Sequence, residues 1–374
     1  MNIIYIANVI LPSRVAGSVH VMKICHAFCK NGHELTLVTR GFDTNQDNDI
    51  SRVDPYKYYD VDPIFKIKQN LFHISFLKIG ILSSLIKSFF CVLKSNKDIV
   101  YGRDLQLCFL LTLFRNKTAF EIHQPIDDLG LLNKYMFSYL VNHKKCIKIV
   151  VITNSLLKWY SQKYPKNIKK FYVAADGADP LKCMSKKDTD RKISVGYVGH
   201  FYKGKGMEVI SKLPKAFKDV DFYIIGGEGK EYTYWKEKIG SLKNVYMPGH
   251  VDQKKVKEYL CKFDIALAPF QNTINPHGNL TNISQWTSPL KIFEYMSSES
   301  AIIASNINVL KEVLDDDINC IMCQYDSLKD WTNAIDELID NSKFRLLLAK
   351  NAKQKFLKKY TWQARASSII NEIS

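Results

Sequence analysis

Short apolar runs alternate with amphipathic segments along nearly the whole chain. In the first half, apolar runs of strand length fall at 3–7, 34–38, 99–102, 119–123 and 147–152. Between the first two runs, apolar residues recur at helical spacing over 18–31, and Gly32 follows where that helix would end. Strands that alternate with helices form parallel sheets covered by helices on both faces. The pattern therefore predicts a doubly wound α/β domain.

The same alternation starts again after a polar stretch, rich in Lys and Asp, at 182–192. The second half has strand-like runs at 193–198, 222–225, 245–247, 265–269, 301–304 and 321–323. We therefore expect an N-terminal domain over 1–180, a C-terminal domain over 181–359 and a terminal helix over 360–374. Doubly wound domains bind ligands at the carboxyl ends of their strands.

Length, charge and cysteines narrow the class of protein. A chain of 374 residues suits two domains better than one core. Its net charge of +16 calls for a polyanionic neighbour, and because the sequence has no motif that reads RNA or DNA, nucleic acid is the least favoured one. Nine scattered cysteines favour a reducing compartment over a disulfide framework, and the pair Cys320 and Cys323 receives no functional role.

The sequence predicts a cytoplasmic protein that touches the inner face of the plasma membrane. It opens on a strand-like run without a basic leader, and no apolar run reaches the roughly 18 residues that span a bilayer. The stretch 64–97 contains no acidic residue, and we expect its basic rim to contact anionic lipid. Its lysines are Lys66, Lys68, Lys78, Lys87, Lys94 and Lys97, and its apolar stripe, expected mainly in the core, is Phe76, Leu77, Ile81, Leu85, Phe89 and Leu93.

The most informative run is Ser288-Pro-Leu-Lys-Ile-Phe-Glu294, which precedes the strand-like run 301–304. It places free backbone N–H groups at the start of an expected helix, with Lys291 in the first turn and Glu294 one turn later on the same face. A helix N-terminus and a lysine bind phosphate, and a carboxylate accepts hydrogen bonds from sugar hydroxyls. The run predicts a site for a nucleotide diphosphate joined to a sugar.

Three glycine-containing turns also follow expected strands. The run 199–206 is close to a P-loop, but Gly206 stands where Ser or Thr would bind Mg²⁺, so we exclude an NTPase and keep phosphate binding by Lys205. The run 226–229 lacks the third glycine and the acidic residue of a dinucleotide fingerprint, which disfavours a nicotinamide enzyme. Gly17 lets a ligand approach the backbone of the first turn.

With these motifs the chain resembles the retaining GT-B glycosyltransferases of glycosyltransferase family 4, and more narrowly their bacterial surface-polysaccharide members. The resemblance covers essentially the whole chain and is most specific at 288–305. It is carried by 12–20, Phe120-Glu-Ile-His123, Asp176-Gly-Ala-Asp179, 199–206, Gly249 and 288–305. It implies two Rossmann-like domains that face a cleft, with a C-terminal helix that crosses back to the N-terminal domain.

The resemblance also implies the ligands and the roles of individual residues. The C-terminal domain would bind a UDP- or GDP-sugar, and the N-terminal domain a lipid-linked glycan acceptor. The catalytic residues would be Lys205 and Lys291 on the diphosphate, Glu294 on the ribose and His123 beside the donor sugar. The donor site would further include Gly17, Gly199, His200, Gly204, Gly227, Gly249, His250, Val251, Ser288, Pro289 and Leu290. Arg14 and Ser18 would contact the acceptor.

Two positions depart from the family's pattern. Trp286 stands where the family often has a Glu, and His200 where it usually has an Arg. These departures keep open an inactive GT-B subunit that binds a partner. A sugar-nucleotide epimerase on the same fold is a second alternative. Because no carboxylate pair can be placed at glycosidase spacing, we expect a front-face transfer that retains the anomeric configuration and needs no metal or other cofactor. We expect the loop 271–287 to help set the choice of donor.

Overall fold

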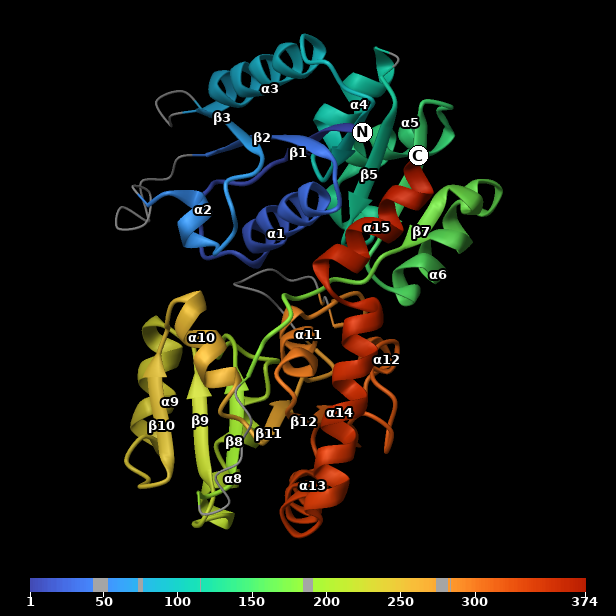
Figure 1. Cartoon of the computed structure of the whole chain (residues 1–374). Coiled ribbons are helices and arrows are strands. Elements are labelled where there is room, and N and C mark those ends of the chain that lie inside the picture. Colours follow the sequence, from blue (N-terminus) through green and yellow to red (C-terminus); the bar gives the residue numbers. More distant parts are fainter. Residues whose placement is uncertain (43–52, 73–76, 115, 184–190, 274–281, 283) are drawn as a thin grey trace. The chain divides into compact units, whose positions relative to one another are not determined.

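A computed structural model of the chain contains two compact units, each built on one parallel sheet (Figure 1). Unit 1 comprises Met1–Ala175 and Trp362–Ser374, and unit 2 comprises Asp176–Thr361. The structure describes all residues except 43–52, 73–76, 115, 184–190, 274–281 and 283, and it leaves the side chains of 40–42, 71–72 and 77–81 undescribed. The two doubly wound sheets confirm the fold class expected from the alternation of strands and helices.

The sheet of unit 1 has seven strands in the order β3-β2-β1-β4-β5-β6-β7. Its first strand is the third from one edge, and the chain adds β2 and β3 on one side of it and then β4 to β7 on the other. The strands are β1 (Asn2–Ala7), β2 (Glu34–Phe42), β3 (Lys66–Phe72), β4 (Ile99–Gly102), β5 (Thr118–Ile122), β6 (Cys146–Val151) and β7 (Phe171–Val173).

Helices cover both faces of this sheet, with α1 and α15 on one face and α3, α4 and α5 on the other (Figure 1). The terminal helix α15 belongs to unit 1 and packs against α1 and β6. The helical segments are α1 (Ala16–Lys30), α2 (Pro55–Tyr58), α3 (Leu77–Leu93), α4 (Leu105–Leu113), η2 (Ile126–Leu129), α5 (Leu131–Asn142), α6 (Asn154–Lys163), η3 (Pro165–Lys170) and α15 (Trp362–Ile373).

The sheet of unit 2 has six strands in the order β10-β9-β8-β11-β12-β13. They are β8 (Ser194–Val198), β9 (Asp221–Ile225), β10 (Val245–Gly249), β11 (Ile265–Ala268), β12 (Ala301–Ser305) and β13 (Ile321–Cys323). The helices are α7 (Met207–Ile210), α8 (Leu213–Ala216), α9 (Gly229–Ile239), α10 (Gln253–Leu260), α11 (Leu290–Ser297), α12 (Asn308–Lys311), α13 (Leu328–Asp340) and α14 (Ser342–Lys359). Apolar side chains from the strands meet Trp235 of α9 and Trp331 of α13 in one core.

The basic stretch 64–97, which we expect to contact anionic lipid, is only partly helical. Its beginning is not helical, because Lys66 and Lys68 lie in the edge strand β3, where one side of the strand faces solvent and tolerates lysine. Lys97 lies beyond the end of α3 at Leu93, and its ammonium donates to the carbonyls of Val92 and Ser95 at 2.7 and 3.3 Å. Phe76 and the side chains of 77–81 lie outside the described residues.

The expectation of free thiols is wrong for one pair of cysteines. Cys183 and Cys261 form a disulfide between the segment after Asp176 and the end of α10. A sequence separation of 78 residues hid this pairing from the sequence. Cys320 and Cys323 are free and buried, and burial raises the pKa of the Cys323 thiol to about 12.

Candidate functional site

The order of strands in unit 2 marks where a ligand site is expected. From β8 the chain moves to β9 and β10 on one side, and later to β11 on the other side. The carboxyl ends of β8 and β11 therefore border the topological switch point of the sheet. Gly199 follows β8 directly, and Phe270 follows β11 after one proline.

The ammonium group of Lys291 is buried at this point. Its Nζ lies 3.9 Å from the ring centroid of Tyr197 and 4.7 Å from that of Phe270. It finds no hydrogen-bond partner among the residues that the structure describes. Burial first, and then the neighbouring charge of Lys205, lower the pKa of Lys291 well below its usual value, against the opposite effect of Glu294.

Lys205 brings a second cation to the same aromatic ring. Its Nζ lies 4.9 Å from the centroid of Phe270 and 5.1 Å from that of Tyr202. Burial lowers the pKa of Lys205 to about 8. Two desolvated ammonium groups over one ring form a cluster of positive charge that suits a phosphate or diphosphate.

Helix α11 adds backbone donors to these two lysines. Its N-cap residue Pro289 makes no side-chain cap, and its first turn holds no acidic residue. The N–H groups at the start of an uncapped helix bind anions. Leu290 begins the helix, Lys291 follows in the first turn and Glu294, half-buried, lies one turn further on, as the sequence predicted.

The turns after β8, β9 and β10 pack closely together. The N–H of Gly199 donates to the carbonyl of Ile225 at 3.0 Å, and the N–H of Gly226 donates to the carbonyl of Gly249 at 2.9 Å. Gly226 has a φ of +112°, and a Cβ there would lie 2.2 Å from the carbonyl oxygen of Gly199. Only glycine fits such a position. The structure thus brings together the turns that carry the predicted donor residues Gly199, Gly227 and Gly249.

The structure also explains why the P-loop pattern is incomplete. Gly206 has a φ of +84°, and a Cβ there would lie 2.0 Å from the carbonyl oxygen of Pro269. A serine or threonine that could bind Mg²⁺ would clash with the backbone at this position. The neighbouring carbonyl of Gly204 accepts a hydrogen bond from the N–H of Gln271 at 3.0 Å, which joins this turn to the end of β11.

The motif Asp176-Gly-Ala-Asp179 forms a strap along α11. The N–H of Asp176 donates to Ser288 Oγ at 3.1 Å, and Ser297 Oγ donates to the carbonyl of Asp179 at 2.7 Å. The Asp179 carboxylate also lies 3.7 Å from the ammonium of Lys257 on α10. The strap fixes the Ser288 turn at the start of α11, so the motif has a structural role in this unit.

Three further predicted donor residues lie on the same edge of the sheet. His200 is exposed, its carbonyl accepts from the Tyr197 hydroxyl at 2.7 Å, and its ring stacks on that of Tyr202 with 5.6 Å between centroids. His250 is exposed and Val251 half-buried, directly after Gly249 at the end of β10.

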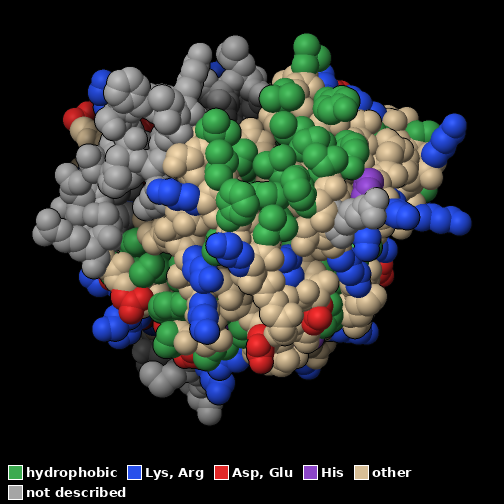
Figure 2. Space-filling view, turned by 90° about the horizontal axis from the view of Figure 1, so that it is seen from above, with side chains coloured by type: hydrophobic (Ala, Val, Ile, Leu, Met, Phe, Trp, Pro, Cys, Tyr) green, Lys and Arg blue, Asp and Glu red, His purple; other side chains and the backbone are tan. Residues whose placement is uncertain are grey.

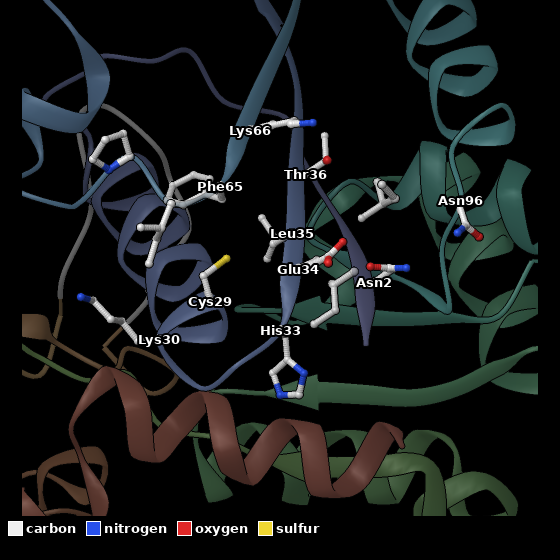
Figure 3. A pocket seen from close by; sticks show the side chains of 14 residues that line it. Asn2, Cys29, Lys30, His33, Glu34, Leu35, Thr36, Phe65, Lys66 and Asn96 are labelled. Carbon is white, nitrogen blue, oxygen red and sulfur yellow. The ribbon is translucent and has the colours of Figure 1, made fainter.

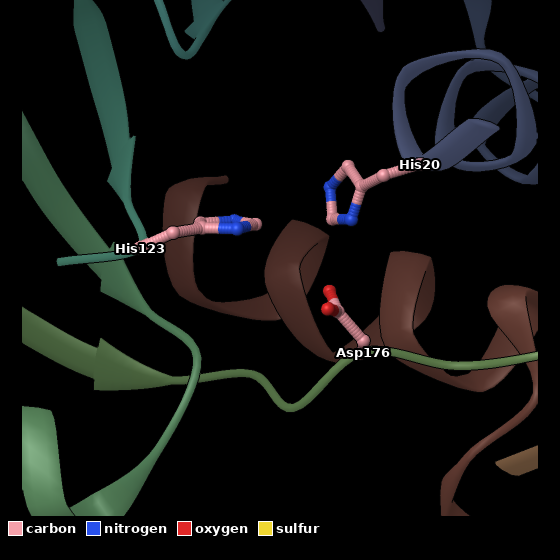
Figure 4. Close-up of side chains that lie close together, drawn as sticks. All are labelled: His20, His123 and Asp176. Atoms are coloured by element: carbon pink, nitrogen blue, oxygen red, sulfur yellow. The ribbon is translucent and has the colours of Figure 1, made fainter. Parts of the chain in front are cut away.

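In unit 1, His123 stands at the carboxyl end of β5 and faces His20 of α1 (Figure 4). Its Nε2 lies 2.5 Å from Oε1 of Glu121, and its Nδ1 lies 3.2 Å from Nη2 of Arg103. The Glu121 carboxylate is fully buried, and it also has Nε2 of His20 at 2.9 Å and Nη2 of Arg365 at 3.1 Å. Burial opposes its ionisation, yet Arg365 and the two histidines hold the pKa of Glu121 well below its usual value.

The predicted contacts in the first loop of unit 1 differ in accessibility. Arg14 is exposed and Gly17 is half-buried. A Cβ on Gly17 would lie 3.8 Å from Nη1 of Arg103. Ser18, predicted to bind the acceptor, is only 2% exposed, and its hydroxyl donates to the carbonyl of Ile10 at 3.2 Å. In this conformation the Ser18 side chain packs within unit 1.

A pocket of about 820 Å³ opens at the opposite edge of the sheet of unit 1 (Figure 3). Asn2, Glu34 and Lys66, which begin β1, β2 and β3, line it. Parallel sheets bind ligands at the carboxyl ends of their strands, and none of the predicted site residues lines this pocket. We therefore assign it no part in the site.

None of the described helices is long and apolar enough to cross a membrane.

Comparison with known proteins bears on unit 2 and on the whole fold. Residues 192–341 match the family model described as glycosyl transferases group 1. An uncharacterized glycosyltransferase of Methanocaldococcus jannaschii is 20% identical over 96% of this chain and 95% of its own length. An uncharacterized 41.2 kDa protein in the cps region of Klebsiella pneumoniae is 27% identical over 74% of this chain and 78% of its own length.

The solved structure of Anabaena HepE in complex with UDP has a TM-score of 0.71 to this chain, at 12% identity, and covers 99% of both chains. The fold is that of the GT-B glycosyltransferases. The match over 192–341 and the named relatives support glycosyltransferase activity. HepE has also been solved in complex with UDP-glucose.

Lys205 and Lys291 were predicted from the sequence, whereas the aromatic rings beside them were not. Phe270 follows a buried strand and Tyr197 lies within one, so both read as core residues. Arg103 was missed because a single basic residue after a strand carries no pattern. Glu121 offered a signal, since it is the one charged residue inside the apolar strand β5.

Proposed function

We propose that the chain is a glycosyltransferase that moves a sugar from a UDP- or GDP-sugar to a hydroxyl of a lipid-linked glycan at a membrane surface. The observation that carries this proposal is the buried ammonium of Lys291, which lies beside Lys205 and the uncapped start of α11. Each of these groups binds an anion, and together they match a diphosphate. The relatives and the family match over 192–341 support the sugar-transfer chemistry.

In this proposal the residues of unit 2 act on the donor. Lys205 and Lys291 balance the charge that grows on the diphosphate as the bond to the sugar breaks, and the N–H groups of α11 hold its oxygens. Glu294 accepts hydrogen bonds from the ribose hydroxyls. The leaving phosphate takes the proton of the attacking hydroxyl on the same face of the sugar, so the anomeric configuration is retained. The lysines supply the positive charge, and the step needs no metal.

The membrane part of the proposal rests on an exposed apolar surface of unit 1 (Figure 2). On α3, Leu82, Ile86 and Phe90 are 56%, 46% and 53% exposed, although they recur at the spacing of one helix face. Ser84 and Ser88 are buried instead, and both hydrogen-bond to Asn70 of β3. The apolar face of α3 therefore points outward.

Two neighbouring helices extend this surface. Phe89 of α3 contacts Phe114 at the end of α4, with 4.9 Å between ring centroids, and α4 packs on α5. The apolar surface consists of Leu82, Ile86, Phe90, Leu113, Phe114, Leu131, Leu132 and Tyr135. Exposed apolar patches of this kind mark interfaces with membranes or other proteins. Because the chain has a net charge of +16, we propose that this apolar surface binds an anionic lipid membrane.

The proposal is tested by nucleotide release. Purified protein is incubated with a panel of UDP- and GDP-sugars and anionic vesicles that carry lipid-linked glycans, and free UDP or GDP is measured. We expect one donor to be consumed only when the acceptor is present, and the product to keep the anomeric configuration of the donor. Consumption without an acceptor and with an altered sugar would instead indicate an epimerase. Consumption of no donor, by protein that binds no nucleotide, would contradict the proposal.

A further inference from the structure

The resemblance assigns His123 to the substrate, but its contacts within unit 1 commit both ring nitrogens to protein groups. A guanidinium group has N–H donors and no acceptor, so Nδ1 of His123 must accept the hydrogen bond from Nη2 of Arg103. The ring proton therefore sits on Nε2, where it is donated to Oε1 of Glu121 at 2.5 Å. In this state the imidazole is neutral and has no free nitrogen for a substrate.

The carboxylate behind His123 is held from several directions. Besides His123, the Glu121 carboxylate accepts from the Tyr101 hydroxyl and lies 3.1 Å from Nη2 of Arg365 on α15. Arg365 in turn donates from Nε to the carbonyl of Ala175 at 3.0 Å. A fully buried, ionised carboxylate with this many partners has one orientation. It therefore fixes the tautomer and the plane of the His123 ring.

The hydrogen bonds from Glu121 through His123 end at the guanidinium of Arg103. Its N–H donates to the carbonyl of Ile6 at 2.9 Å, which fixes its backbone between β4 and β1, the topological switch point of unit 1. No carboxylate of a described residue lies within salt-bridge distance of its guanidinium, and among the described residues His123 is its only side-chain hydrogen-bond partner. Most of its five N–H donors are therefore available at the edge of the sheet where ligands bind.

We propose that Arg103 is a phosphate-binding residue of unit 1, and that His123 and Glu121 are positioning residues that aim its guanidinium. A planar fork of N–H donors matches the oxygens of a phosphate, and a guanidinium held in place loses little freedom on binding. This inference rests on the proposed function for the source of the phosphate. Both the donor diphosphate and a lipid-linked acceptor carry a phosphate group that Arg103 could bind.

The test observes the His123 ring by NMR, because its Nδ1 shares a hydrogen bond with Arg103. The full chain is labelled with ¹⁵N-histidine, and the His123 signals are assigned from the variant His123→Asn. We expect a neutral ring with the proton on Nε2. UDP and geranyl diphosphate are then titrated as phosphate probes, and we expect at least one of them to shift the Nδ1 signal in wild type but not in Arg103→Ala. A ring protonated on Nδ1, or signals that neither probe moves, would overturn the proposal.

Variants separate the source of the phosphate and the role of His123. Lys291→Met tests the proposed function separately, because it should lose UDP binding. If this variant still shows the shift of the His123 Nδ1 signal with geranyl diphosphate, the phosphate comes from the acceptor. A shift with UDP alone assigns it to the donor. His123→Asn keeps an oxygen that can accept from Arg103, so it should bind the active probe within about threefold of wild type, whereas His123→Phe should weaken binding about tenfold. Equal losses in both variants would contradict a positioning role.

Discussion

Lys291 and Lys205 hold their ammonium groups over the same ring, that of Phe270, at 4.7 and 4.9 Å from its centroid. The ring attracts each cation, but the two cations repel each other, and Lys291 Nζ is buried without a hydrogen bond among the described residues. The burial and mutual repulsion of the two cations therefore destabilise the free protein, and a bound anion would reduce this unfavourable free energy.

Replacing Lys291 by methionine should stabilise the free protein. Methionine fills nearly the same volume without an unpaired charge, and we expect a gain of about 1 kcal/mol after loss of the contacts with the rings. That gain corresponds to a rise in Tm of about 2–4 °C, measured by calorimetry without ligand. Because the pKa of Lys291 is lowered in the fold, the gain should be largest at low pH and shrink as the pH approaches 10. A lower Tm in Lys291→Met would contradict this reading of the site.

Nucleotide affinity should fall as the pH rises through 8. The pKa of Lys205 is lowered to about 8 in the free protein, and a bound phosphate raises it, so binding takes up protons above that pH. The phosphate itself, with a pKa of about 6, is already ionised there. Calorimetry between pH 7 and 9.5, in two buffers that differ in ionisation enthalpy, measures both effects. Lys205→Met should flatten the profile, and a pH-independent affinity in wild type would contradict the prediction.

Restoring the P-loop serine should damage the protein rather than create a Mg²⁺ site. In Gly206→Ser the new Cβ would lie 2.0 Å from the Pro269 carbonyl oxygen, so we expect a loss of about 2–5 kcal/mol. Gly229→Ser is the matched control, because Gly229 also has a positive φ, of +59°, but nothing lies within 4 Å of its Cβ. The control should lose only about 1 kcal/mol. Denaturant unfolding compares the two, and equal losses would show that the clash is absent.

The apolar surface of unit 1 should bind anionic vesicles. Phe90→Glu places a charge in this surface and removes an aromatic ring, so partitioning to vesicles of mixed neutral and anionic lipid should drop about tenfold. Leu346→Glu is the control, since Leu346 of α14 is 67% exposed but belongs to unit 2. Sedimentation with vesicles measures both variants. An equal effect of the two substitutions, or none, would exclude this surface as the lipid contact.

Much of the architecture could be predicted from the sequence because buried parallel strands and amphipathic helices differ in period. The runs at 3–7 and 301–304 are apolar throughout, and both form interior strands, with a neighbour on each side. The edge strand β3 was missed, since Lys66 and Lys68 alternate with other residues on a strand that is covered on one side only. The outward face of α3 could not be predicted either, because its apolar and serine positions both recur at helical spacing.

The candidate site was also predicted only in part. Lys205, Lys291 and Glu294 were predicted because Lys205 lies in a turn after a strand, Lys291 lies in the first turn of a helix, and Glu294 lies one turn further along that helix. Phe270 and Arg103 were not predicted, because the roles that we propose for them depend on which strands are neighbours in space: β11 beside β8, and β4 beside β1. The buried Glu121 gains its meaning only from Arg365, which lies more than two hundred positions away in the chain.

The most direct test of the account is calorimetric binding of UDP, GDP, dTDP and CMP to wild type and to Lys291→Met. A charge-assisted hydrogen bond to phosphate contributes roughly 1.5–3 kcal/mol, so the account predicts that one nucleotide binds wild type and that the variant loses about tenfold or more in affinity. Binding of none of the four to folded wild-type protein, or equal affinity of the variant, would contradict a donor site at Lys291.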